Sequence, residues 1–119
     1  MDFYIGNSMD EVNYDNECAS FSDEFSDYLW KRRHLLPDCA MSLFYIDPYD
    51  DVIIDINSVY NIVELCKFII DSSILDDYKN SYEAQHGDEY DEVKEMVESL
   101  YEIGKKAIEL NNGLISIGD

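Results

Sequence analysis

The sequence predicts an α+β fold in which residues 1–119 form a single acidic domain. A small antiparallel sheet is expected to pack with two long helices and one shorter helix. Three observations carry this prediction. Two stretches place apolar residues at three- and four-residue steps, the spacing of amphipathic helices. Short apolar runs rich in β-branched and aromatic residues favour strands. A hydrophobic content of 46 % separates the chain from acidic disordered segments.

The N-terminal part of the chain is expected to begin with a short strand and to continue into a helix. The strand is predicted at Phe3–Ile5, which is apolar and aromatic. The helix is predicted over Asp23–Arg33, with the hydroxyl of Ser20 or Ser22 capping its N-terminus. Its apolar side chains follow helical spacing at Phe21, Phe25, Tyr28 and Leu29.

The central part of the chain predicts a β-hairpin. Two runs, Met41–Ile46 and Val52–Ile56, are apolar and rich in β-branched or aromatic residues. Between them lies Asp47–Asp51, where a proline fixes one backbone angle and aspartate side chains can bond nearby backbone groups. This composition is typical of a turn between paired strands.

Two longer helices are predicted in the second half. The first runs from Asn57 to near Ser72. The second begins among the acidic residues of Asp88–Glu92 and ends before Asn111–Gly113, which tolerate a left-handed stop. Acids in its first turns and lysines toward its end complement the helix dipole. A polar, turn-rich connection with a brief helical stretch is expected over 71–87, and a closing strand at 114–117.

The charge balance is the strongest indication of function. The chain carries 27 acidic and 8 basic side chains, a formal net charge of −19. Its first thirty residues contain eight acids and no base. A field this strong destabilises the fold by self-repulsion, and it favours either solubility or association with a positively charged surface. We expect a basic protein partner and no direct contact with nucleic acid, whose phosphates the field would repel.

Compartment and redox state are also suggested by the sequence. No apolar run approaches the ~20 residues that cross a bilayer, and the start of the chain lacks the basic residues of a signal peptide. We therefore expect a cytoplasmic protein without membrane contact. The cysteines Cys18, Cys39 and Cys66 form an odd set without C-x-x-C spacing, so they predict buried thiols and no zinc site or disulfide framework.

Motifs for catalysis, cofactors and metals are missing from the sequence. The Asp47–Asp51 segment lacks the central glycine and terminal glutamate of a calcium-binding loop. Neither His34 nor His86 has a neighbouring nucleophile in a recognisable arrangement. The five glycines form no phosphate-binding loop. We therefore expect a protein that is not an enzyme, with no cofactor, no catalytic residues and no metal site.

Ten tyrosines give a second indication of binding, because tyrosine combines apolar contact area with a polar group and is enriched at interface hot spots. Four are expected to lie at the edge of the core: Tyr28, Tyr45, Tyr60 and Tyr101. Tyr49, Tyr78 and Tyr90 are better candidates for an interface, since they fall in predicted turns or at the entrance to a helix.

Residues 43–119 also resemble a group of small acidic bacterial proteins. The pattern consists of Leu43–Asp51, the pair Glu64–Leu65 in the next helix, an acidic second helix and the terminal Gly113–Asp119. It is similar to the immunity proteins of polymorphic and contact-dependent toxin systems. The resemblance implies a cytosolic antidote that binds and blocks its cognate toxin, often a nuclease with a basic active site.

Together these observations predict an acidic face that occludes the active site of a basic toxin. The face would combine the aspartate-rich turn, the following polar connection and the start of the last helix. The predicted partner-binding residues are Asp47, Tyr49, Asp50, Asp51, Asp76, Asp77, Tyr78, Glu89, Tyr90 and Asp91.

Two other classes of function remain open from the sequence. A phage or mobile element could encode a nucleic-acid mimic whose carboxylates imitate phosphates and inhibit a host nuclease. A small enzyme could use Asp47 and Asp51 as acid and base, although no positioned partner accompanies them. The sequence specifies neither the identity of the toxin nor the oligomeric state.

Overall fold

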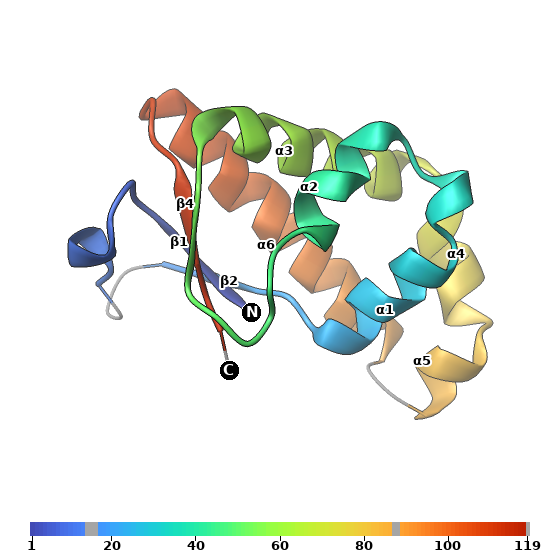
Figure 1. Ribbon diagram of the computed structural model, residues 1–119. Helices are drawn as coiled ribbons and strands as arrows, with labels where there is room; N and C mark the ends of the chain where they lie inside the picture. The colour runs from blue at the N-terminus through green and yellow to red at the C-terminus, as the bar shows by residue number, and fades with distance from the viewer. Residues whose placement is uncertain (14–16, 87–88, 119) are drawn as a thin grey trace.

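A four-stranded antiparallel sheet, with helices packed against it, organises the computed structural model of the protein (Figure 1). The structure describes residues 1–13, 17–86 and 89–118. The strands are β1 (Asp2–Ile5), β2 (Ala19–Ser20), β3 (Val52–Ile54) and β4 (Leu114–Ile117), in the spatial order β2-β1-β4-β3. The strands nearest the two ends of the chain pair directly, with Asp2 opposite Ile117 and Ile5 opposite Leu114. The predicted α+β class is confirmed.

Helices account for most of the remaining chain. They are α1 (Asp23–Lys31), α2 (Met41–Phe44), α3 (Ile56–Asp71), α4 (Ile74–Lys79), α5 (Tyr82–His86) and α6 (Tyr90–Glu109). Short 3-10 turns are formed by η1 (Met9–Glu11), η2 (Arg33–Leu35) and η3 (Asp38–Ala40). Figure 1 shows α3 and α6 side by side along the molecule, with α1 and α4 toward the end away from the sheet.

The packing of α3 against α6 forms the centre of the core, as the apolar spacing of both segments predicts. The buried side chains of α3 are Val59, Ile62, Leu65, Cys66 and Ile69, and the buried residues of α6 are Val93, Val97, Leu100, Ile103, Gly104 and Ala107. Gly104 lies so close to α3 that a Cβ there would come within 2.5 Å of Val63 Cγ2. Glycine at this position lets the two helices approach.

Capping residues set the ends of several helices. The Ser22 hydroxyl accepts a hydrogen bond from the Phe25 amide at 3.1 Å, so Ser22 is the cap of α1. The Asp55 carboxylate accepts from the Ser58 amide at 2.9 Å and caps α3. Asn111 follows α6 with a φ of 52°, which is the predicted left-handed stop.

The predicted hairpin over Met41–Ile46 and Val52–Ile56 is wrong in its first strand. Residues 41–44 form helix α2, and β3 pairs with β4 instead. Leu43 and Ile46 are both buried, which is the three-residue step of a helix rather than the alternation of a strand. The second strand is also shorter than predicted, because Asp55 caps α3 and ends the extended segment at Ile54.

The predicted exposed connection over 71–87 is more ordered than expected. It contains α4 and α5, and Leu75 and Tyr78 of α4 are buried in the core. The connection is therefore part of the packed structure. Gly87, Asp88 and the terminal Asp119, which were expected in a loop, at a helix start and in a closing motif, lie outside the described residues.

The N-terminus is bonded to the segment that enters α1. The amino group of Met1 donates a hydrogen bond to the Phe21 carbonyl at 3.1 Å, and the Phe21 amide donates to the Met1 carbonyl at 2.8 Å. This pairing places Met1 beside the first turn of α1. It thereby brings two distant segments of the chain together at one surface.

Candidate interaction site

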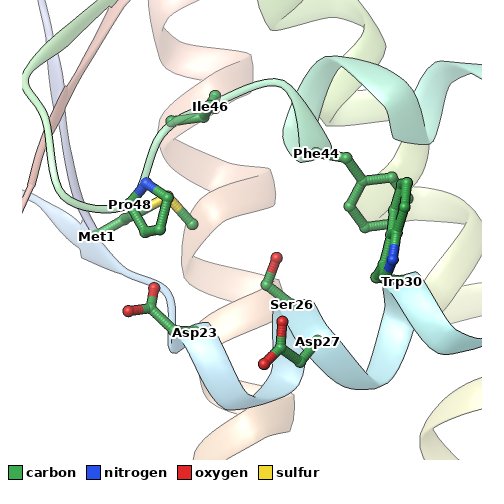
Figure 2. Close-up of a pocket in the computed structure, with 8 residues that line it drawn as sticks. All are labelled: Met1, Asp23, Ser26, Asp27, Trp30, Phe44, Ile46 and Pro48. Atoms are coloured by element: carbon green, nitrogen blue, oxygen red, sulfur yellow. The ribbon is translucent and has the colours of Figure 1, made fainter.

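A pocket of about 280 Å³ opens between α1 and residues 44–48 (Figure 2). Its lining consists of Met1, Asp23, Ser26, Asp27, Trp30, Phe44, Ile46 and Pro48. Figure 2 shows the side chains from α1 along one side of the hollow and those of residues 44–48 along the other. The pocket therefore has polar groups on its helical side and apolar groups opposite them.

The helical side of the pocket follows from the amphipathic spacing of α1. Phe25, Tyr28 and Leu29 face the core and are buried, so Trp30 falls outside the apolar stripe. The Trp30 side chain is 43 % exposed. Its ring meets that of Phe44 edge to face, with centroids 5.2 Å apart and planes at 81°. This contact closes one end of the pocket.

The opposite side carries the most exposed aromatic residues of the described chain. Ile46 is buried and Pro48 is half-buried, and both line the pocket. Their neighbours Tyr45 and Tyr49 are 80 % and 76 % exposed. Tyr45 was expected at the edge of the core, and that prediction is wrong. Apolar surface that stays in solvent beside a pocket is typical of an interaction site.

The basic residues nearest the pocket are bound to aromatic rings and backbone. The Arg33 guanidinium lies 4.2 Å from the Trp30 ring centroid and donates to the Trp30 carbonyl at 2.9 Å. The Arg32 guanidinium lies 3.7 Å from the Tyr28 centroid. Neither arginine forms an ion pair with a described carboxylate. The two pocket carboxylates therefore have no described basic partner.

Asp23 is the less solvated of these two carboxylates. Its Oδ1 atom is buried, and no hydrogen-bond donor contacts it among the residues that the structure describes. Asp27 lies one turn further along α1 and is exposed. A buried acceptor without a donor is costly, by about 1–3 kcal/mol. The acceptor that the pocket presents to an outside donor is therefore the exposed Asp27 carboxylate.

The aspartate-rich segment beside the pocket is a turn, as predicted, although it connects a helix to a strand. The Asp47 carboxylate accepts from the Tyr49 amide at 2.9 Å. The Asp51 carboxylate accepts from the Gly118 amide at 3.1 Å. Gly118 packs so tightly on the backbone of Asp50 that a Cβ would overlap it. The Asp47–Asp51 turn and Gly118 both belong to the sequence pattern that resembles immunity proteins, and they thus lie in contact.

The remaining predicted acids belong to a different part of the surface. Asp76 and Asp77 are exposed in the first turn of α4, while Glu89 and Asp91 are exposed at the start of α6. Tyr90 lies close to this group, because the Lys79 ammonium is 5.2 Å from its ring centroid. Figure 1 shows the Asp47–Asp51 turn near the strands and α4 toward the other end of the molecule. The predicted site is thus divided between two faces.

Tyr78 was predicted to be an interface residue, and this prediction is wrong. Its side chain is only 1 % exposed. Its ring packs edge to face against Tyr28 and Phe25, with centroid distances of 5.0 and 5.3 Å. The residue lies on the buried side of α4, three positions after buried Leu75, whereas it was assigned to an exposed loop.

A row of carboxylates along α6 was not identified from the sequence. Asp91, Glu95, Glu98 and Glu102 are all exposed and follow one another at three- and four-residue steps. Such steps place side chains on one face of a helix, so this spacing was the available signal. Glu17 lines two hollows of about 330 and 220 Å³ beside the same helix.

The cysteines differ in their surroundings, against the expectation of buried thiols. Cys18 is exposed, Cys39 is half-buried and Cys66 is buried. Burial in the core, together with the neighbouring Cys39, raises the pKa of Cys66 to about 12. Burial also raises the pKa of Cys39, and Glu64 adds to the effect. Neither Cys39 nor Cys66 therefore has the lowered pKa that makes a thiol reactive.

Tyr60 was also expected at the edge of the core and is exposed instead, on the outer side of α3.

Within the described ranges, His, Cys, Asp and Glu side chains form no group of three that could hold a metal ion. No helix in the described part of the chain has the length and apolar character that a bilayer crossing requires. Comparison of the chain with protein-family models, with curated proteins and with solved structures finds no match.

Proposed function

We propose that this chain is an immunity protein that binds a basic protein toxin, such as a nuclease, and neutralises it by covering its active site. It acts in the cytoplasm, by binding rather than by catalysis. The observation that carries the proposal is the lack of internal pairing: the net charge is −19, yet the described side chains form one ion pair, between Lys106 and Glu17 at 3.6 Å. The resemblance of residues 43–119 to immunity proteins supports the same assignment.

Unpaired exposed carboxylates have a direct effect on association. They repel one another within the fold, and each retains its full attraction for an external cation. Steering by such a field raises association rates by roughly 10 to 10³ at low salt. An antidote benefits from this effect, because it must capture its toxin before the toxin reaches its substrate.

The pocket face supplies the contacts that follow the first encounter. It comprises α1 and residues 44–51, and it carries the exposed rings of Trp30, Tyr45 and Tyr49 and the exposed carboxylates of Asp27 and Asp50. Aromatic residues dominate the energetics of protein interfaces, and acidic neighbours select a basic partner. We therefore assign the toxin-binding surface to this face.

A neutralisation assay tests the proposal. The protein encoded by the gene next to this one would be expressed alone and together with this chain, and cell survival and affinity would be measured. We compare the pair Asp50→Lys with Asp27→Lys against the pair Glu95→Lys with Glu102→Lys, which changes the net charge equally. The first pair is expected to weaken binding more than about tenfold and to abolish protection, while the second retains protection.

Several outcomes would contradict this function. The neighbouring protein could fail to bind, or it could bind without losing toxicity in the complex. Equal weakening by both pairs of variants would attribute binding to overall charge and would remove the assignment to the pocket face. Stability of each variant is checked first by thermal unfolding, since all four residues are exposed.

The carboxylate row on α6 favours a second function, that of a nucleic-acid mimic inhibiting a nuclease. Four acids from Asp91 to Glu102 follow a helix that rises about 1.5 Å per residue, so the row spans roughly 17 Å. The molecule is also elongated, with extents of 41 × 25 × 21 Å. If this function holds, the Glu95→Lys and Glu102→Lys pair abolishes inhibition of the nuclease, and the pocket-face pair leaves it intact.

A further inference from the structure

We infer that the pocket between α1 and residues 44–48 receives one lysine or arginine side chain from the protein partner. The inference rests on the proposed function in one respect, which is that the partner is basic. It goes further by assigning the point of contact and the chemistry of the inserted group. Three features of the pocket carry it: its apolar wall, its carboxylates without a described ion-pair partner, and the exposed ring of Trp30.

The apolar wall suits the stem of a long basic side chain. Met1, Ile46 and Pro48 lie on the side facing α1, and Phe44 lies at the end that Trp30 closes (Figure 2). Lysine and arginine stems cover apolar surface readily while their charged ends stay in polar surroundings. A short acidic or hydroxyl side chain would leave this wall uncovered.

The polar side of the pocket suits the charged end. Asp23, Ser26 and Asp27 follow one another on the first two turns of α1, and Asp23 Oδ1 is buried without a donor among the described residues. An ammonium or guanidinium group supplies donors only, so it can pair with the Asp27 carboxylate, which is the exposed one of the two. Arg33 is not part of the lining, because it lies over the Trp30 ring.

The segment that supplies the apolar wall also carries two exposed tyrosines. Tyr45 and Tyr49 are 80 % and 76 % exposed, and they flank Ile46 and Pro48 in the chain. Energetically important interface residues are enriched in tryptophan, tyrosine and arginine, and they pair across the interface. The exposed ring of Trp30, which lines the pocket, therefore matches an arginine or lysine inserted from the partner.

The size and charge of the site argue against other occupants. Sites for cofactors and drug-sized molecules are usually roughly 300–1,000 Å³, whereas this pocket holds about 280 Å³. This volume is large enough for one side chain. A second copy of this chain would bring another formal charge of −19 against the same carboxylates, which disfavours self-association here.

Trp30 provides a direct measurement, because it is the only tryptophan of the chain and it lines the pocket. The full-length protein would be titrated with a blocked arginine tripeptide, acetyl-Gly-Arg-Gly-amide, while its tryptophan fluorescence is recorded. The matched probe replaces arginine by citrulline, which has nearly the same shape without the charge. We expect a saturable change with the arginine peptide and a much weaker one with the citrulline peptide.

Two variants with the same change in charge locate the binding. Asp27→Asn removes a pocket carboxylate, and Glu24→Gln removes an exposed carboxylate of the same helix that is outside the lining. Asp27→Asn is expected to weaken arginine binding roughly two- to fivefold, as for a partly exposed ion pair. Glu24→Gln is expected to leave it unchanged. Equal weakening by both variants, or equal binding of the citrulline peptide, would overturn the inference.

The result of this pocket test can be distinguished from the result of the neutralisation test of the immunity function. If the arginine peptide binds at the pocket but no neighbouring basic protein is neutralised, the pocket assignment stands and the immunity function fails. If a toxin is neutralised equally well by the Asp27→Asn and Glu24→Gln variants, the immunity function stands and the pocket assignment fails. Binding by a small uncharged molecule in place of the arginine peptide would also reject the assignment.

Discussion

The α3–α6 packing and the pocket face use their side chains in opposite ways. Between α3 and α6 the facing side chains are apolar and buried, and Gly104 allows close approach to Val63. On the pocket face, Trp30, Tyr45 and Tyr49 stay exposed beside carboxylates without described basic partners. The difference indicates that stability is concentrated in the α3–α6 packing and that the proposed recognition surface adds little to it. Substitutions in the two regions should therefore have separable effects.

The largest effect on stability is expected from Leu100→Ala in α6. Leu100 is completely buried, so the substitution leaves a cavity in the core and lowers the free energy of unfolding by about 2–5 kcal/mol. Urea unfolding measures the change. Leu110→Ala is the control, since Leu110 follows α6 and is exposed. If both variants lose stability equally, the core does not centre on the α3–α6 contact.

A smaller loss is expected from Gly118→Ala, at the junction between the two regions. The added methyl group overlaps the backbone of Asp50, and overpacking of this kind costs about 1–3 kcal/mol. It also separates the Gly118 amide from the Asp51 carboxylate. Thermal unfolding measures the loss, with Ile53→Ala on the exposed side of β3 as the control. A variant as stable as the wild type would show that the turn is not held by the C-terminal strand.

Alkaline pH should weaken the core through Cys66. The unfolded thiol ionises near 9.0, whereas the folded thiol keeps its proton until about 12. Below pH 9.0 both states are protonated and the contribution to stability is complete. Above pH 9.0 only the unfolded state loses the Cys66 proton. The free energy of unfolding therefore falls by about 1.4 kcal/mol per pH unit up to the folded pKa of Cys66.

Urea unfolding at about pH 8 and about pH 10 measures this slope. Cys66→Ala is expected to remove the part of the slope that Cys66 contributes, and Cys18→Ala is expected to retain it because Cys18 is exposed. The same slope in all three proteins would contradict a buried, protonated thiol in α3.

The smallest effect on stability is expected from Asp27→Asn on the pocket face. Asp27 is exposed and forms no described ion pair, so the free energy of unfolding should stay within about 0.5 kcal/mol of the wild type. Loss of one negative charge also relieves repulsion within the acidic chain. A large loss of stability in thermal unfolding would mean that this carboxylate holds the fold, and the comparison of the two regions would fail.

The same two regions differ in how far the sequence predicts them. Helices α3 and α6 extend over enough turns for their apolar spacing to identify them, and Asn111 marks the end of α6. Residues 41–46 form too short an apolar run for spacing to separate a helix from a strand. Tertiary packing decides there, since Leu43 and Ile46 both reach the core from a helical turn.

The candidate site was predicted in part. The aspartate turn and exposed Tyr49 lie where the sequence placed them, whereas Tyr78 is buried because the segment that carries it is a helix. The pocket was missed because it joins Met1, α1 and residues 44–48, which only the tertiary structure brings together. Trp30 gave one usable signal, since it lies outside the apolar stripe of its helix.

The central claim is that unpaired carboxylates steer this chain to a basic protein. The most direct test is the association rate with the neighbouring gene product, measured by stopped-flow fluorescence of Trp30 at low and high salt. We predict a rate that falls by roughly tenfold or more as salt screens the field, while the dissociation rate changes little. An association rate independent of salt would contradict the account, because the charge would then have no part in recognition.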